Sequence, residues 1–199
     1  MLVIGLTGLI AAGKSSVAAL LGARGAELID CDQLAHEALA VGSPGLAAVV
    51  ERFGNQLLRP DGSLDRAALG AIVFADRVAL TDLERIVHPI VGRLRSARIA
   101  ASVAPAVVVE AIKLVESGYH RECHSLWVVT APVALRVQRL VHLRGMDEAD
   151  ARSRIAAQGS DADKVRMANE VIVNDGGRAW LERQTEAAWQ RALASGREP

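Results

Sequence analysis

Gly8-Leu9-Ile10-Ala11-Ala12-Gly13-Lys14-Ser15 is the stretch that decides the fold. It fits the pattern G-x-x-x-x-G-K-[ST], in which backbone N–H groups and a helix N-terminus surround a phosphate. An apolar run, Leu2–Leu6, precedes it, and a helix-forming run, Ser16–Leu21, follows it. This strand–loop–helix context predicts a phosphate-binding loop instead of a glycine-rich turn without a ligand.

The residue types in the loop suit a nucleotide triphosphate with its magnesium ion. Gly8 and Gly13 allow turns and a close backbone approach that a Cβ would obstruct. Lys14 is expected to reach the β- and γ-phosphates, and the Ser15 hydroxyl is expected to bind Mg²⁺. The other nucleotide contacts predicted for the loop and first helical turn come from Ala11, Ala12 and Ser16.

Composition limits the alternatives. The chain has 199 residues, is 51% hydrophobic and has a formal net charge of zero, which favours one domain without a nucleic-acid or membrane partner. Cys31 and Cys123 form no C-x-x-C pair, which is typical of a reduced, cytoplasmic protein. The longest later apolar stretch, Ile99–Val109, is too short to cross a bilayer. We expect a monomer, although the sequence leaves an oligomer open.

Short apolar runs alternate with longer helical patterns along the chain, which predicts an α/β fold of three layers, α/β/α, with a five-stranded parallel sheet. The expected strands are Leu2–Leu6, Glu27–Asp30, Ala106–Glu110, Leu126–Thr130 and Val171–Val173. The expected helices are Lys14–Ala23, Cys31–Ala40, Pro44–Phe53, Arg66–Val73, Val78–Val87, Ile90–Ala101, Val133–Leu143, Glu148–Ala157 and Arg178–Ala194.

Several local signals refine these ranges. Pro44 and Pro132 are predicted at first helical positions, and Asp65 and Asp147 are predicted N-caps. The all-helical segment 44–104 separates the second and third strands and is expected to form an inserted subdomain. The tail 195–199 is expected to fray.

Two carboxylates, Asp30 and Asp32, come at the carboxyl end of the second strand. In a parallel sheet this end carries the ligand. Asp32 is therefore predicted to orient a substrate hydroxyl and accept its proton, and Asp30 to hold a Mg²⁺-bound water. Capping of the following helix by one of the two is the structural alternative.

An ordered series of motifs along nearly the whole chain resembles the dephospho-CoA kinase family. The series comprises Gly5-Leu6-Thr7-Gly8, Ile29-Asp30-Cys31-Asp32, Arg52-Phe53-Gly54, Asp61-Gly62-Ser63-Leu64-Asp65-Arg66-Ala67-Ala68-Leu69, Ile72-Val73-Phe74, His88-Pro89-Ile90, Arg154-Ile155-Ala156-Ala157-Gln158 and Val171-Ile172-Val173-Asn174.

The resemblance implies a P-loop kinase domain over residues 1–199 that moves the ATP γ-phosphoryl group to the ribose 3′-hydroxyl of dephospho-CoA, the last step of coenzyme A synthesis. Asp32 matches the family's catalytic base. The helical segment 44–104 resembles the family's CoA-binding domain, and 137–167 resembles its lid. The family loop usually has glycine, glycine and serine where this chain has Leu9, Ala11 and Ala12. A loop that required a positive φ at Ala11 would cost stability.

Arginines in the lid-like helices suit developing phosphoryl charge. Arg139, which matches the family, and Arg144 are the preferred candidates, for catalysis and nucleotide binding respectively. The alternative is that these arginines form a solvated helix face. For Arg152 and Arg154, the other two arginines considered, the pairs Glu148–Arg152 and Asp150–Arg154 favour that alternative.

Three further residues have both a functional and a structural interpretation. His88 is a substrate-contact candidate through the family match, or a helix-boundary residue before proline. Asn174 is a nucleotide-binding candidate in a loop after the last strand, or part of a plain turn. Lys113 is a substrate-binding candidate, or else a solvated helix residue. Nearby, Glu116 is expected to be a structural or metal-side carboxylate.

Three other functions remain open on the sequence alone. Another small-molecule kinase of the nucleoside monophosphate type would share the sheet, loop and lid. A non-catalytic homologue would keep the fold. A GTPase-like switch would need a guanine-specifying Asn-Lys-x-Asp element, which the sequence lacks.

Overall fold

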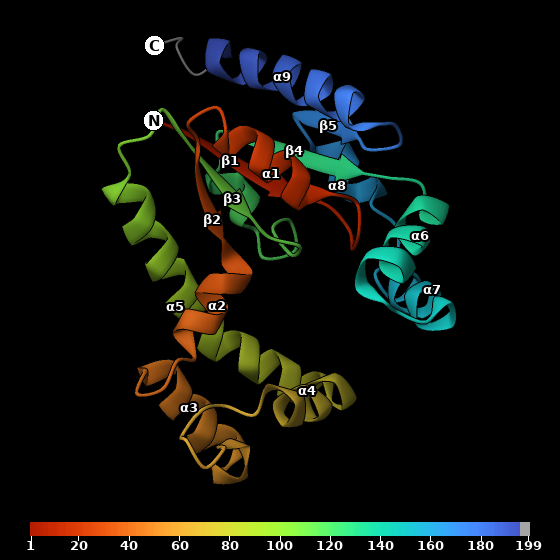
Figure 1. Cartoon of the computed structure of the whole chain (residues 1–199). Helices are drawn as coiled ribbons and strands as arrows, with labels where there is room; N and C mark the ends of the chain where they lie inside the picture. Colours follow the sequence, from red (N-terminus) through yellow and green to blue (C-terminus); the bar gives the residue numbers. More distant parts are fainter. Residues whose placement is uncertain (196–199) are drawn as a thin grey trace. The chain divides into compact units, whose positions relative to one another are not determined.

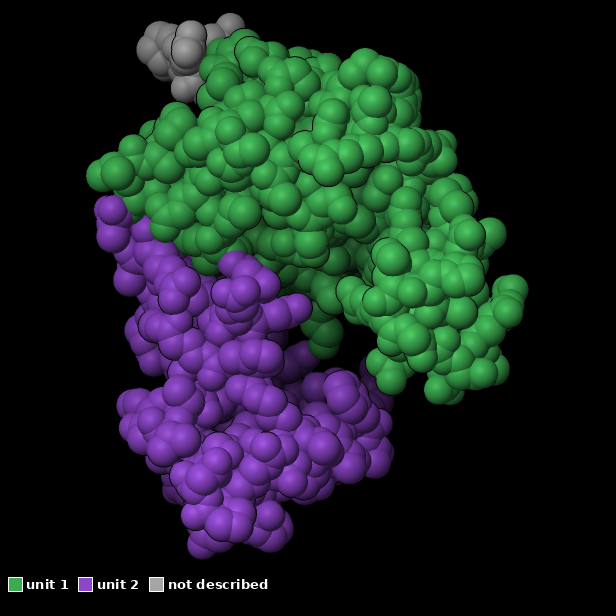
Figure 2. Space-filling model, viewed as in Figure 1, with its two compact units in different colours: residues 1–29, 102–199 green, residues 30–101 purple. Residues whose placement is uncertain are grey.

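The computed structural model describes residues 1–195. The chain divides into two compact units, coloured separately in Figure 2. The sheet unit comprises Met1–Ile29 and Ser102–Pro199, and the helical unit comprises Asp30–Ala101. The insert expected over 44–104 overlaps the helical unit, which also takes in the preceding helix.

The sheet unit is built on five strands in the order β2-β3-β1-β4-β5 (Figure 1). β1 pairs in parallel with β3 and β4, and β4 pairs in parallel with β5. Every residue of β1 is buried, as expected for a central strand covered on both faces. The five predicted strands are confirmed, three of them one residue longer than expected. Their bounds are β1 Leu2–Thr7, β2 Glu27–Asp30, β3 Ala106–Glu110, β4 Ser125–Thr130 and β5 Glu170–Val173.

Helices cover this sheet and complete the predicted α/β fold. Helices α1 (Lys14–Gly22) and α9 (Arg178–Ser195) pack against each other (Figure 1). Their apolar residues, Trp189 of α9 among them, form one core with alternate residues of β1, such as Leu6, and with Trp127 of β4. The opposite sheet face packs so closely at Gly5 that a Cβ there would lie 2.6 Å from Leu114 Cδ2. The remaining elements of the unit are η2 (Tyr119–Glu122), α6 (Val133–Arg144), α7 (Glu148–Ala157) and α8 (Ala162–Met167).

Of the four helix starts expected from the sequence, three are confirmed and one is wrong. Asp65 and Asp147 each accept hydrogen bonds from two backbone N–H groups of the helix that follows. Pro44 begins its helix, but Pro132 lies one residue before α6, with a ψ of 142°. Pro132 therefore ends the extended segment and does not take the first helical position.

The helical unit is organised around one long helix, α5 (Arg77–Ala101). The helices packed against it are α2 (Cys31–Ala38), α3 (Pro44–Phe53) and α4 (Arg66–Ala75), and η1 (Asn55–Leu57) links α3 and α4. The prediction of two helices divided at His88-Pro89 is wrong. A proline inside a helix costs ~3 kcal/mol, and burial of Val87 and Val91 on either side of it offsets that cost.

Two limits complete the fold. Across residues 1–195, no helix combines the length and apolar character needed to cross a membrane. Ser195 closes α9, and the rest of the tail expected to fray, 196–199, lies outside the described residues.

Candidate active site

The phosphate-binding loop joins the end of β1 to the start of α1, as predicted. Its two glycines are required by close contacts. A Cβ at Gly8 would lie 2.3 Å from the backbone oxygen of Val129. Gly13 has a φ of 102°, and a Cβ there would lie 2.0 Å from Asn174 Nδ2. No other residue type fits these positions without moving the backbone or Asn174.

Ala11 has a left-handed backbone, with a φ of 58°. Within residues 1–195 no other non-glycine residue has a positive φ. This conformation costs an alanine about 1–2 kcal/mol. The sequence raised this possibility, because the family usually has glycine at this position. The loop therefore keeps its shape in spite of a local strain.

Three successive carbonyl oxygens of the loop accept hydrogen bonds from side chains outside it. Arg136 Nε donates to the Ile10 oxygen at 2.8 Å. Arg139 Nη1 donates to the oxygens of Ala11 and Ala12 at 3.1 and 3.2 Å. Since these donors neutralise the negative ends of the peptide dipoles, the loop favours an anion at its amide groups.

The start of α1 supplies the other half of the site. Lys14, Ser15 and Ser16 are the first three residues of the helix, where backbone N–H groups have few helical acceptors and the dipole favours negative charge. Ser15 and Ser16 are exposed, whereas Lys14 is half-buried. The predicted nucleotide-binding residues of the loop are thus adjacent at one helix N-terminus.

Arg139 and Asn174 are brought together at this loop. Arg139 Nη2 donates to the Asn174 backbone oxygen at 2.9 Å, and Asn174 Nδ2 donates to the Ala12 oxygen at 2.9 Å. Asn174 is 7% exposed, so it is not part of a plain solvated turn. Both side chains, predicted from different parts of the chain, contact the same peptide of the loop.

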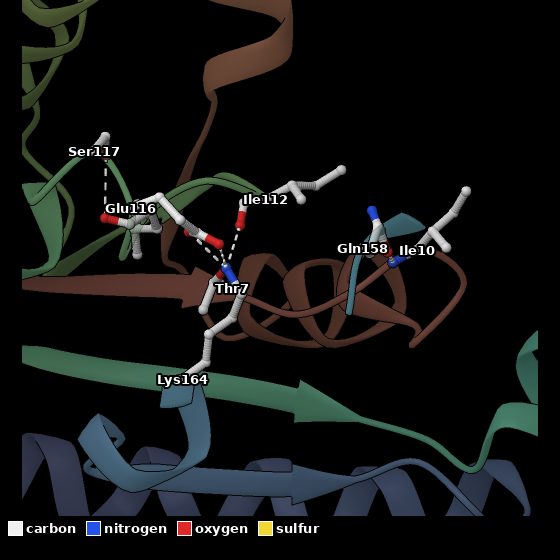
Figure 3. A network of polar contacts seen from close by, with 8 residues as sticks. Thr7, Ile10, Ile112, Glu116, Ser117, Gln158 and Lys164 are labelled. Carbon is white, nitrogen blue, oxygen red and sulfur yellow. Dashed lines mark hydrogen bonds and ion pairs between the residues drawn. The ribbon is translucent and has the colours of Figure 1, made fainter. Parts of the chain in front are cut away.

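A second polar network lies at the base of the loop (Figure 3). The Ile112 oxygen accepts hydrogen bonds from Thr7 Oγ1 at 3.0 Å and from Lys164 Nζ at 2.9 Å. Lys164 Nζ also lies 2.6 and 2.7 Å from the two carboxylate oxygens of Glu116. Because Thr7 directly precedes Gly8, this network fixes the point where the loop leaves the sheet. Of the two roles open for Glu116, the structure supports the structural one.

The charges of this pair are unequally exposed. The side chain of Lys164 is 5% exposed and that of Glu116 is 56% exposed. Partial burial opposes ionisation of Glu116, but the hydrogen bond and charge of Lys164 outweigh it and lower its pKa. The pair is therefore a buried cation held by a carboxylate at the surface.

The candidates in the helical unit are Asp30, Asp32 and His88. Asp30 is the N-cap of α2, and its Oδ1 accepts from the Asp32 backbone N–H at 2.8 Å. The capping alternative is thus confirmed for Asp30. Asp32 is exposed in the first turn of α2, and His88 is exposed within α5 and does not mark a helix boundary. Burial raises the pKa of Cys31 to about 11, which disfavours a thiolate nucleophile.

Two further candidates of the sheet unit, Lys113 and Arg144, are exposed. Lys113 is exposed in the turn after β3, so its interpretation as a helix residue is wrong. Arg144 is exposed as the last residue of α6. The predicted pair Glu148–Arg152 is confirmed, with the nearest atoms 2.7 Å apart.

Sequence reasoning missed two side chains that contact the loop, Arg136 and Gln158. Gln158 closes one of the motifs quoted above, and Arg136 precedes Arg139 by one helical turn. That i,i+3 spacing places both arginines on one side of α6 and was the available signal for Arg136.

The donor set suits a magnesium ion bound mainly through phosphate oxygens. In the part of the chain that the structure describes, no group of three His, Cys, Asp or Glu side chains could hold a metal by itself. Mg²⁺ in nucleotide sites usually takes one or two protein oxygens and otherwise phosphates and water. The exposed Ser15 hydroxyl fits that pattern.

Comparisons with known proteins agree with this geometry. The model of the dephospho-CoA kinase family matches residues 2–179. A dephospho-CoA kinase of Streptomyces avermitilis is 46% identical over 200 residues, which span 100% of this chain and 98% of that protein. Among solved structures, TT1252 from Thermus thermophilus has a TM-score of 0.83 at 34% identity and covers 96% of this chain and 97% of its own. A dephospho-CoA kinase from Campylobacter jejuni has a TM-score of 0.71 at 25% identity, with 98% of each chain covered.

The match extends over both units and includes the phosphate-binding loop, the lid-like helices and the last strand. The chain belongs to the dephospho-CoA kinase family.

Proposed function

We propose that the chain transfers the γ-phosphoryl group of ATP to the ribose 3′-hydroxyl of dephospho-CoA, giving coenzyme A and ADP. The observation that carries this proposal is the complete phosphate-binding loop at the start of α1, in a chain that matches the family over residues 2–179.

The loop and Lys14 have the role of holding the triphosphate. Phosphoryl transfer passes through a loose transition state, so catalysis depends on positioning and on charge placed around the transferred group. Backbone N–H groups of the loop and of the start of α1 bind the phosphates, apart from those of Ile10 and Ala12, which donate to Gln158 and to the Leu9 oxygen. Ala11, Ala12 and Gly13 form the turn, and the Lys14 ammonium contacts the β- and γ-phosphates. Ser15 would hold Mg²⁺, and Asp30, whose Oδ1 caps α2, is assigned to a water of that ion. The ion would supply charge neutralisation at the phosphate oxygens.

The acceptor side depends on Asp32. We assign this carboxylate to orient the ribose 3′-hydroxyl and accept its proton. His88 and Lys113 are assigned to contact dephospho-CoA, and the helical unit is assigned to bind it. Exposure of Asp32 in the first turn of α2 leaves its carboxylate available for this role.

The lid-like helices have the role of closing over the phosphates. Arg139 and Arg144 are assigned to the developing charge and to the nucleotide, and Asn174 to the nucleotide. Closure would exclude water and strengthen each of these contacts. Arg139 already lies at the loop, where it donates to Ala11 and Ala12.

A coupled assay of ADP release tests the proposal. Purified protein with Mg-ATP is given dephospho-CoA, AMP, CMP or shikimate in parallel. We expect turnover with dephospho-CoA and background rates with the others. Lys14→Ala should lose about two to three orders of magnitude, the usual weight of a positioned charge in such a site. Turnover of AMP or shikimate in preference to dephospho-CoA would replace the proposal with the alternative kinase.

A further inference from the structure

The tip of the phosphate-binding loop, Ile10, is held through both polar groups of its backbone. Its N–H donates to Gln158 Oε1 at 2.7 Å (Figure 3). Its carbonyl oxygen accepts from Arg136 Nε at 2.8 Å. Neither partner belongs to the loop. Arg136 lies in α6, and Gln158 is the C-cap residue that directly follows α7.

The two side chains also bond to each other. Arg136 Nη2 donates to Gln158 Oε1 at 3.4 Å, so the amide oxygen accepts from Ile10 and Arg136 together. Arg136 is only 4% exposed. Burial of a guanidinium is costly unless its donors are bonded, so these bonds determine where the side chain can lie. Arg136, Gln158 and Ile10 form a closed hydrogen-bonded triangle, called the tip clamp below.

Apolar contacts also hold the tip of the loop at Ile10. Ile10 and Ala11 pack on a small core formed by α6 and α7, whose buried members are Val137, Leu140, Ala151 and Ile155. The loop is thus attached to these two helices by main-chain hydrogen bonds and by side-chain packing. The position of its tip follows theirs.

The loop needs this external support more than a glycine-rich one would. Ala11, the neighbour of Ile10, has a left-handed φ of 58° that alanine disfavours. Relaxation of that residue would turn the peptides on either side of it and misdirect the N–H groups that face a phosphate. Bonds to both polar groups of Ile10 oppose such a turn.

We propose that Arg136 and Gln158 are positioning residues that hold the phosphate-binding loop in its nucleotide-binding shape by clamping Ile10, without contacting the nucleotide. The proposal rests on nucleotide binding by the loop, one part of the proposed function. It does not depend on which molecule accepts the phosphoryl group.

Gln158 offers a sharp test, because both of its contacts use the oxygen as an acceptor. Gln158→Glu keeps an acceptor for Ile10 and Arg136, whereas Gln158→Met keeps the length and removes it. Binding of β,γ-imido-ATP with Mg²⁺ is measured by calorimetry. We expect Gln158→Met to bind about tenfold more weakly, the worth of one positioned hydrogen bond, and Gln158→Glu to bind within about threefold of the wild type.

Arg136 gives the second arm. Arg136→Met should also weaken binding about tenfold. The double variant with Gln158→Met should be little worse than either single variant, since all three break the same clamp. Arg152→Met is the matched control. It removes an arginine of α7 that pairs with Glu148 at the surface and is 62% exposed, and it should leave binding unchanged.

The KM values separate the tip clamp from a purely structural role. The tip clamp predicts a higher KM for ATP with an unchanged KM for dephospho-CoA, whereas a purely structural role would affect both KM values equally. Wild-type affinity in Gln158→Met, equal weakening in Gln158→Glu, or equal effects on both KM values would overturn the proposal. If Arg136→Met does not fold, the Gln158 pair still decides it. Loss of acceptor turnover with intact nucleotide binding would count against the proposed function and leave the clamp standing.

Discussion

Replacing Ala11 by glycine should change the stability of the protein much less than replacing its neighbour Ala12 by glycine. The two alanines are adjacent in the same loop but differ in backbone conformation. Ala11 has a φ of 58°, and Ala12 has no positive φ. Ala12 is 1% exposed, whereas Ala11 is only partly buried. The pair therefore separates backbone strain from loss of a methyl group.

The expected magnitudes follow from these differences. In Ala11→Gly, relief of the left-handed alanine contributes about 1–2 kcal/mol. The greater unfolded-state entropy of glycine costs about 0.5–1 kcal/mol, and loss of a half-buried methyl group costs about 0.4 kcal/mol. The net change is within about 1 kcal/mol of zero. Ala12→Gly relieves no backbone strain and removes a fully buried methyl group, so it should lower the free energy of unfolding by about 1.5 kcal/mol.

Thermal unfolding of the two variants beside the wild type tests this reasoning. For a chain of this size, 1 kcal/mol corresponds to about 2–4 °C in Tm. Ala12→Gly should lower Tm by about 3–6 °C, and Ala11→Gly should leave it within about 3 °C. If Ala11→Gly lowered Tm as much as Ala12→Gly, the left-handed strain assigned to Ala11 would be refuted.

The remaining predictions concern the acceptor side and the base of the loop. Asp32→Asn should reduce kcat strongly while changing the KM for ATP about twofold at most, because the carboxylate acts on the acceptor; steady-state kinetics check this, and a large rise in the KM for ATP would contradict it. In urea unfolding, Glu116→Leu should lower stability by about 3 kcal/mol and Lys164→Met by about 1–2 kcal/mol. The first loss is larger because Glu116→Leu leaves the buried ammonium of Lys164 without its anion. The reverse order would contradict the assignment of Lys164 as the buried partner. The pKa of Glu116 is lowered from 4.5, so its contribution is complete above the unfolded pKa and lost as pH falls through the lower folded value. Glu116→Gln should therefore lose less stability than the wild type over that acidic range, as measured by unfolding at several pH values.

The sheet and the loop could be predicted because their signals are local. Buried parallel strands appear as continuous apolar runs, and all five are found within one residue of their predicted ends. The phosphate-binding loop is a fixed pattern whose glycines meet close contacts at Val129 and Asn174. Asp65 and Asp147 cap their helices through neighbouring N–H groups, so their role also depends on a few adjacent residues.

The parts that could not be predicted depend on contacts between distant segments. Pro89 normally breaks a helix, but α5 continues through it because its flanking residues are buried on neighbouring helices. The contact of Arg136 with Ile10 joins residues 126 positions apart. Its i,i+3 spacing from Arg139 indicates which side of α6 it occupies, but not that its side chain is buried against the loop. Lys164, near the middle of the short α8, is buried only because the turn after β3 supplies Ile112 and Glu116.

The loop is proposed to deliver the γ-phosphoryl group of ATP to the 3′-hydroxyl of dephospho-CoA. Proton-coupled ³¹P NMR of the product formed from dephospho-CoA and Mg-ATP tests it most directly. We expect a new phosphomonoester signal coupled to the ribose 3′ proton, in amounts equal to the ADP formed. ADP with free phosphate and unchanged dephospho-CoA, or a phosphate at another position, would contradict it.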